Sequence, residues 1–171
     1  MKNIFLIGFM GTGKSTVADY LSRNHGMEIL EMDQLIAERE GRSISDIFSQ
    51  CGEEYFRNAE TKLLIEIQDT HNKIVSCGGG VVLRAKNVVE MKKSGQIVLL
   101  TAEPGTILER VKGNDQRPLL QGNMNVTYIS EMIEKRREKY EQAADVVIHT
   151  DRKSVSQICK EILEQVKMTG E

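Results

Sequence analysis

The chain has 171 residues, of which 40% are hydrophobic and 28% are charged, a size and balance that suit one compact domain with one sizeable core. Its 23 basic and 25 acidic residues leave a net charge of −2, which argues against charge-driven binding to nucleic acid or to an anionic membrane. No apolar run approaches the roughly 20 residues of a membrane-spanning helix, and the 3 widely spaced cysteines match neither a disulfide framework nor a C-x-x-C metal site. We therefore expect one domain over residues 1–171, in the cytoplasm and with free thiols. A monomer is also expected, although these features do not determine the oligomeric state.

Short apolar runs alternate with longer amphipathic segments along the chain. This alternation is typical of an α/β fold, in which helices cover both faces of a parallel sheet. Strands are predicted at residues 4–7, 27–30, 73–76, 97–100 and 146–149. Their Val, Ile and Leu content suits strands that are buried on both faces.

Several helices have recognisable ends. Capping patterns mark helix starts at Ser43 with Asp46, at Pro104, and at Ser154 with Gln157. A helix predicted at about residues 53–70 has an apolar stripe. The stripe consists of Phe56, Ala59, Leu63 and Ile67. It indicates the core-facing side and leaves the other side of this helix for chemistry.

A polar stretch at about residues 112–126 interrupts the pattern. It is rich in Gly and Asn, lies between two helical patterns and is too long for an ordinary connector. Loops of this kind often close over an active site. We therefore expect a lid here.

Residues 8–15 carry the most specific motif. They match G-x-x-x-x-G-K-[ST] between a predicted strand and a predicted helix, which is the context that a phosphate-binding loop (P-loop) requires. In such a loop the backbone N–H groups surround the phosphates, the lysine reaches the β and γ oxygens and the hydroxyl binds Mg²⁺. A chance match is the alternative, and the flanking strand and helix argue against it. The motif predicts that Lys14 and Ser15 bind a nucleotide and Mg²⁺.

Glu31 and Asp33 follow the second predicted strand. Alternation along an extended segment would put both carboxylates on one side, where they could serve Mg²⁺ hydration and an acceptor hydroxyl. Asp33 could instead cap the helix that follows it. Both interpretations are open from the sequence.

Arg57 and Glu60 stand at positions i and i+3 of one helix, which indicates either part of a site or a plain surface ion pair. Residues 78–80 are three glycines after the third predicted strand. Consecutive glycines are costly unless the backbone must approach something closely, so a ligand-facing strand end is favoured over a plain tight turn. The charged run at residues 134–140 is predicted to be mostly a solvated face.

Taken together, these motifs resemble the shikimate kinase family nearly from end to end. Residues 8–16 are similar to its phosphate loop, Asp33 to the second acid of its D-x-D motif, and residues 52–60 to its G-E-x-x-F-R-x-x-E helix. The glycine triplet, the Arg-Pro-Leu-Leu stretch that begins at Arg117, and Arg136 four residues before Tyr140 complete the set in the family's order.

The resemblance implies a three-layer α/β/α P-loop kinase fold of the nucleoside-monophosphate-kinase type. Its five-stranded parallel sheet would have the order 2-3-1-4-5, with substrate-binding helices at about residues 33–61 and a lid loop. It also implies transfer of the γ-phosphoryl group of ATP to the 3-hydroxyl of shikimate, giving shikimate 3-phosphate and ADP in the pathway to chorismate and the aromatic amino acids.

Family roles then fall on matching residues. Asp33 would hold the shikimate hydroxyls and accept the proton of the attacking one. Arg57 and Arg136 would grip its carboxylate, with Gly79 and Gly80 beside the ring. The catalytic set would be Lys14, Asp33 and Arg117, the last reaching the transferring phosphates from the lid. The implied ATP-binding residues are Gly11, Thr12, Gly13, Lys14, Ser15, Thr16, Arg110, Arg117 and Lys153. Mg²⁺ would be bound by Ser15 and, through water, by Glu31.

Glu31 is a departure from the family pattern, which has Asp at this position. The extra methylene moves the carboxylate by roughly one bond length, and Mg²⁺ tolerates little geometric error. A contact through water would absorb the change, whereas direct ligation would alter Mg²⁺ affinity or preference.

Two rival functions remain open. One is another small-metabolite kinase of the same fold, such as a gluconate or nucleotide kinase, although a pair of arginines suits a substrate carboxylate better than a nucleobase. The other is a nucleotide-binding switch or a non-catalytic regulator, against which the complete set of motif residues argues.

Overall fold

The computed structural model describes residues 1–112 and 125–169, and its centre is one parallel sheet. The strands are β1 (Asn3–Ile7), β2 (Glu28–Glu31), β3 (Lys73–Ser76), β4 (Gly95–Thr101) and β5 (Val146–His149). They lie in the order β2-β3-β1-β4-β5, and the pairings along the sheet are parallel, with Phe5 opposite both Val75 and Ile97. The predicted fold class and strand order are confirmed.

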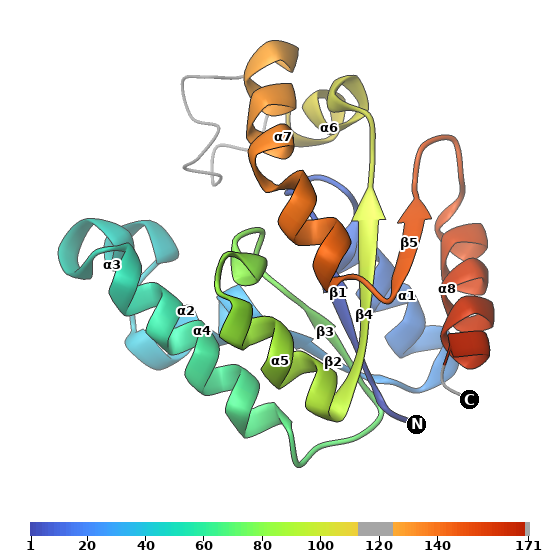
Figure 1. Cartoon of the computed structure of the whole chain (residues 1–171), viewed down its shortest axis with the longest axis horizontal. Helices are drawn as coiled ribbons and strands as arrows, with labels where there is room; N and C mark the ends of the chain where they lie inside the picture. The colour runs from blue at the N-terminus through green and yellow to red at the C-terminus, as the bar shows by residue number, and fades with distance from the viewer. Residues whose placement is uncertain (113–124, 170–171) are drawn as a thin grey trace.

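Helices form the two outer layers (Figure 1). They are α1 (Lys14–His25), α2 (Met32–Glu40), α3 (Ile44–Cys51), α4 (Glu53–Ile67), α5 (Ala85–Ser94), α6 (Pro104–Val111), α7 (Val126–Ala143) and α8 (Val155–Thr169), with a short 3₁₀ turn, η1 (Val81–Leu83). Helices α1 and α8 cover one face, where Leu21 and Ile162 pack against Ile4 and Leu6. Helices α4, α5 and α7 cover the other face, over Phe5 and Ile7 of β1. The central strands are therefore buried between two helical layers, as their composition predicts.

The edge strands differ from the prediction that all strands are buried. Ile29 of β2 is 39% exposed and Val147 of β5 is 41% exposed, because an edge strand has a neighbour on one side only and the helices do not cover its rim. Three predicted strands also differ in their bounds: β1 begins one residue earlier, at Asn3, β2 is displaced by one residue, and β4 extends beyond residues 97–100 at both ends.

The predicted helix starts are confirmed. Ser43 accepts a hydrogen bond from the Asp46 N–H at 3.1 Å, and Pro104 is the first residue of α6. Ser154 and Gln157 bond reciprocally, each side chain accepting from the other's N–H. Helix α4 ends at Ile67 rather than near residue 70, because the hydroxyl and the N–H of Thr70 both donate to the Ile67 carbonyl and turn the chain away.

The carboxyl ends of the parallel strands meet at one edge of the sheet. The connection after β1 runs to one side of the sheet, to β2, whereas the connection after β3 crosses to β4 on the other side of β1. Ligands of open α/β sheets bind at such a switch point. The fold thus brings the loops after β1, β2 and β3 together. Within the part of the chain that the structure describes, no helix is long and apolar enough to cross a membrane.

Candidate active site

The loop after β1 has the conformation of a P-loop. Gly8, Gly11 and Gly13 have φ values of 142°, 79° and 101°, and at Gly8 a side chain would also collide with the Leu100 carbonyl. Gly13 is the N-cap of α1 and, because it has no side chain, it cannot cap the first N–H groups of the helix. The first N–H groups of α1 therefore face outward at a helix N-terminus, the usual place for a phosphate.

The polar side chains of this loop have distinct environments. Lys14 Nζ donates to the Gly8 and Phe9 carbonyls at 2.6 and 3.1 Å, which holds the ammonium over the loop. The Thr12 hydroxyl is buried and donates to the Phe9 carbonyl at 2.8 Å, so it stabilises the loop itself. Ser15 and Thr16, at the start of α1, are exposed.

A cavity of about 600 Å³ lies beside the P-loop. Its lining brings together the predicted residues Lys14, Ser15, Glu31, Asp33, Arg57, Gly79, Gly80 and Arg136. These residues come from the start of α1, the end of β2, the first turn of α2, the loop after β3, and helices α4 and α7. One cavity therefore contains the P-loop lysine, two acids and two arginines.

The two acids reach the cavity in a way that the sequence analysis did not foresee. Glu31 ends β2 and is the N-cap of α2, whereas Asp33 already lies in the first turn of that helix. Asp33 therefore does not cap α2, and that alternative is wrong. Both carboxylates line the same cavity, as predicted, but the reason given for it is wrong, since the start of α2 and not an extended segment turns Asp33 toward the cavity.

Each glycine of the triplet makes room for a different side chain. A Cβ at Gly78 would lie 2.7 Å from Asp33 Oδ1, and one at Gly79 would lie 3.4 Å from Arg136 Nη1. A Cβ at Gly80 would clash with the guanidinium of Arg57. The glycines therefore allow an acid and two arginines to contact one backbone segment, and the close-approach interpretation is supported over a plain turn.

Gly80→Ala should consequently destabilise the protein by about 1–3 kcal/mol, since the new methyl must displace the buried Arg57 side chain. Urea unfolding measures the effect. Gly105→Ala is the matched control, because nothing lies within 4 Å of a Cβ at that helical position and Ala favours a helix. Equal stabilities of the two variants would contradict the packing described for Gly80.

Arg57 and Glu60 form a buried ion pair. Arg57 Nη1 lies 2.7 Å from Glu60 Oε1, and the two side chains are 10% and 0% exposed. The more exposed Glu53 contacts the same guanidinium at 3.2 Å. The surface ion pair considered from the sequence is therefore wrong, because α3 and the glycine triplet cover this face of α4.

Glu60 is unusual because one of its oxygens lacks a partner. Among the described residues Oε2 is buried and accepts no hydrogen bond. Burial raises the pKa of Glu60 to about 7, and the attraction of Arg57 offsets only part of this effect. Burial outweighs this attraction, because Arg57 divides its charge between Glu60 and Glu53.

The raised pKa predicts a pH-dependent stability. The ordinary pKa of the Glu60 carboxyl is 4.5, and its pKa in the folded chain is about 7. Between these pH values Glu60 is protonated in the folded chain and ionised in the unfolded chain. The contribution of Glu60 to the free energy of unfolding therefore falls as pH rises through this window. Glu60→Gln removes this dependence. The stability of the wild type relative to Glu60→Gln should therefore fall between these pH values in urea titrations. A slope of the opposite sign would show that the ion pair, and not burial, controls the pKa.

Arg136 and Tyr140 bring α7 to the glycine triplet. The Tyr140 hydroxyl donates to the Gly79 carbonyl, and the ring is 4% exposed. Arg136 Nη1 is buried and has no hydrogen-bond partner among the described residues. A buried guanidinium nitrogen without an acceptor is costly, so this part of the cavity suits an anionic ligand.

Gly11, Thr12, Gly13 and Thr16 belong to the P-loop and the start of α1 but do not line this cavity. The other three predicted nucleotide-binding residues lie outside the P-loop or outside the described residues. Arg110 Nη1 donates to the Gly11 carbonyl at 3.1 Å and to Thr150 Oγ1 at 3.2 Å, next to the P-loop. Lys153 Nζ pairs with Glu161 at 2.9 Å. Arg117 and nearly all of the predicted lid fall outside the described residues, while Asn125 caps α7 and Val126 begins it.

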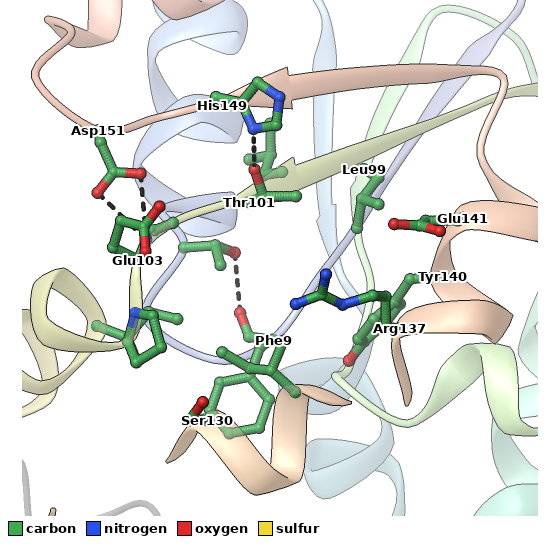
Figure 2. Close-up of a pocket in the computed structure, with 16 residues that line it drawn as sticks. Phe9, Leu99, Thr101, Glu103, Ser130, Arg137, Tyr140, Glu141, His149 and Asp151 are labelled. Carbon is green, nitrogen blue, oxygen red and sulfur yellow. Dashed lines mark hydrogen bonds between the residues drawn. The ribbon is translucent and has the colours of Figure 1, made fainter. Parts of the chain in front are cut away.

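A second cavity, of about 280 Å³, lies between α7 and the carboxyl ends of β4 and β5 (Figure 2). Its polar groups largely bind one another: His149 Nδ1 lies 2.6 Å from Thr101 Oγ1, and Asp151 accepts from the Glu103 N–H. Of the residues that the structure describes, neither a P-loop lysine nor a buried arginine lines it. The larger cavity is therefore the candidate active site.

The sequence analysis missed two aromatic residues of the site. Phe48 and Phe56 line the larger cavity, and the Arg57 guanidinium lies 5.9 and 5.3 Å from their ring centroids. The sequence analysis places Phe56 on the apolar stripe of its helix and in the G-E-x-x-F-R-x-x-E pattern, but not among the site residues. Adjacent residues of a helix do not ordinarily face each other, so the spacing of Phe56 and Arg57 does not signal a cation–π contact.

Mg²⁺ fits the donor set of this cavity, although the described residues contain no cluster of His, Cys, Asp or Glu that could bind a metal by itself. The hydroxyl of Ser15 and the carboxylates of Glu31 and Asp33 line the same space as Lys14. Mg²⁺ commonly takes one or two protein oxygens and completes its shell with phosphate and water. The residues present therefore suit a nucleotide-bound Mg²⁺.

Comparisons with known proteins agree with this geometry. A family model described as shikimate kinase matches residues 10–167. A shikimate kinase of Persephonella marina is 42% identical over 167 residues, which cover 98% of this chain and 100% of that protein. A solved shikimate kinase from Acinetobacter baumannii, in complex with shikimate, superposes with a TM-score of 0.91 at 30% identity over 98% of this chain and 94% of that chain. The shikimate kinase from Aquifex aeolicus gives 0.82 at 34% identity, over 98% of both chains. On this evidence, the chain belongs to the shikimate kinase family.

Proposed function

We propose that this chain transfers the γ-phosphoryl group of ATP to the 3-hydroxyl of shikimate, giving shikimate 3-phosphate and ADP. As in its family, ATP is the co-substrate and the reaction leads toward chorismate and the aromatic amino acids. The observation that carries the proposal is the buried Arg136 Nη1, which lacks an acceptor among the described residues and lines one cavity with Arg57 and the P-loop lysine.

A carboxylate matches this pair of arginines. The planar guanidinium binds carboxylate oxygens in a bidentate manner, and such charge-assisted hydrogen bonds are stronger than neutral ones. Arg57 is already oriented by Glu60 and Glu53, whereas Arg136 Nη1 has a free donor position among the described residues. Both residues, with Gly79 and Gly80 at the ring, would bind the acid end of shikimate.

The hydroxyl end of shikimate would lie toward Asp33 and the P-loop. Asp33 holds the hydroxyls and accepts the proton of the attacking oxygen. Phosphoryl transfer leaves little covalent work to the protein, so positioning and charge neutralisation dominate. Lys14 supplies part of that neutralisation, and Arg117 supplies more from the lid at about residues 112–126.

The nucleotide would lie along the P-loop, where residues 11–16 surround its phosphates. Mg²⁺, bound by Ser15 and through water by Glu31, would neutralise the charge of the β and γ phosphates. Arg110 and Lys153 would lie near the adenine. Contact through water would let the longer Glu31 side chain replace the Asp of the family pattern without a change in metal preference.

An acceptor panel tests the proposed function. ADP release is measured with ATP and Mg²⁺ in the presence of shikimate, gluconate, AMP or CMP, and we expect turnover with shikimate alone. Turnover with only another acceptor would favour the rival kinase. ATP binding without turnover on any acceptor would favour a nucleotide-binding regulator.

We also propose that the protein is one domain and acts as a cytoplasmic monomer. All three cysteines are free, and Cys77 and Cys159 are buried, which fits a reducing compartment. Burial also raises the pKa of the Cys77 thiol, so this residue is a packing group of the cavity wall rather than a nucleophile. Light scattering coupled to gel filtration would test the monomer.

A further inference from the structure

A buried chain of polar groups connects α4 to the glycine triplet from behind the active-site cavity. Thr61, one turn after Arg57, donates its hydroxyl to Asn87 Oδ1 at 2.6 Å and lies 3.0 Å from the Arg57 carbonyl. Asn87 Nδ2 donates to the carbonyl of Val81, the residue after the triplet, at 2.9 Å. Asn87 is fully buried in the first turn of α5. Neither Thr61 nor Asn87 lines the cavity.

The partners fix the orientation of the Asn87 amide. The Val81 carbonyl can only accept, so the NH₂ group must face it and Oδ1 must face the Thr61 hydroxyl. Replacing the amide would leave the Val81 carbonyl without its donor in a dry environment, which is costly. The amide therefore holds α4 and the residue after the triplet at one fixed separation.

The separation between α4 and the triplet is important for the site because the two segments are in close contact. Gly80 lies against the Arg57 guanidinium so closely that no Cβ fits between them. On the other side, the Gly79 carbonyl accepts from the Tyr140 hydroxyl of α7. A small shift of the triplet relative to α4 would therefore move Arg57 and Gly79 relative to each other.

We propose that Asn87 is a positioning residue for substrate recognition, which sets the distance between Arg57 and the glycine triplet through its bonds to Thr61 and Val81. The inference rests on the proposed function, since it assumes that Arg57 and Gly79 contact the carboxylated end of shikimate. Asn87 itself touches no substrate. Its loss should therefore weaken shikimate recognition and leave ATP recognition intact.

The test compares Asn87→Ala with Asn3→Ala. Asn3 is the matched control because it is also fully buried and both ends of its amide are also hydrogen-bonded to other segments of the chain. Its Nδ2 donates to the Thr70 carbonyl at 2.9 Å, and its Oδ1 accepts from the Lys73 N–H at 3.0 Å. Asn3, however, is the first residue of β1 and lies at the amino-terminal end of the strands, whereas the cavity lies at their carboxyl end. Both variants should lose thermal stability.

Steady-state kinetics well below the unfolding temperature separates the two roles. Asn87→Ala should raise the KM for shikimate about tenfold to a hundredfold, because small misplacements of binding groups have effects of this size. The KM for ATP should stay within about twofold, and Asn3→Ala should leave both constants near those of the wild type. In an Arg57→Lys background the effect of Asn87→Ala on the KM for shikimate should shrink, since the two residues act on one contact.

The outcomes distinguish the inference from the function on which it rests. A wild-type protein that does not turn over shikimate refutes the proposed function before any variant is made. An active wild type with an unchanged KM in Asn87→Ala, or with equal rises in both asparagine variants, overturns the inference. If Asn87→Ala does not fold, Thr61→Val decides: it removes the hydroxyl and leaves the bond to Val81, and it should raise the KM for shikimate at least about threefold.

Discussion

Lys14→Met should lower kcat by about 10³-fold or more. The ammonium lies over the P-loop, held by the Gly8 and Phe9 carbonyls, and we propose that it neutralises charge on the transferring phosphoryl group there. Removing one group that stabilises charge in the transition state typically costs about 10²–10³-fold, and groups on the transferred phosphoryl cost up to about 10⁵-fold. Coupled ADP-release assays at saturating ATP and shikimate measure the loss.

Lys160→Met is the matched control for this variant. Lys160 is a 77% exposed lysine on α8, whose ammonium pairs weakly with Glu164. Its loss should leave kcat unchanged. Wild-type turnover in Lys14→Met, with thermal unfolding that shows a folded protein, would remove Lys14 from the catalytic set.

Arg136→Ala should lower kcat/KM for shikimate by about 30-fold to 5,000-fold, because truncating one member of a buried charged contact costs about 2–5 kcal/mol. The stability of the free protein should not fall to a comparable extent, since among the described residues Arg136 Nη1 has no hydrogen-bond partner and removing an unpaired buried nitrogen also removes its cost. Kinetics with varied shikimate and varied ATP should show the loss only for shikimate.

The neighbouring residue provides the control. Arg137 lines the second cavity, is 58% exposed and pairs with Glu134. Arg137→Ala should therefore keep both specificity constants. Equal losses in the two variants would indicate damage to α7 rather than removal of a binding group.

The sequence predicts local and repeating features of this protein well. Consecutive residues specify strand β1, the P-loop and the start of α8. A motif of about 10 residues is therefore enough to predict each of them without knowledge of the rest of the fold. The strand order came from the resemblance to a family, because periodicity alone does not say which strands are neighbours.

Burial is harder to predict than position. Arg57 and Glu60 have the i, i+3 spacing of any surface pair. They are removed from water by α3, the helix that precedes α4, and by the glycine triplet, which is distant in the sequence. Asp33 shows a second limit. Helix α2 begins one or two residues earlier than the sequence suggests, so Glu31 ends a strand and Asp33 lies in a helical turn, whereas both were expected in one extended segment. Helix boundaries are the least certain part of a sequence-based prediction.

Asn87 shows a third limit. Nothing near it in the sequence marks it, because its partners Thr61 and Val81 belong to other elements. Asparagine in the first turn of a helix is ordinarily assigned to local capping. Only the packing of α5 against α4 shows that its amide joins two other elements.

The two arginines that we propose bind the substrate carboxylate belong to separate helices, α4 and α7. A substrate bound to both of them would connect these helices non-covalently. Amide protons of α7 should therefore exchange with deuterium more slowly when shikimate is saturating, with a slowing of up to about 100-fold at a ligand concentration of about 100 times Kd. Helix α8 packs in a different core cluster, and its exchange should slow less. Shikimate would thus act on the dynamics of the molecule as well as being its substrate.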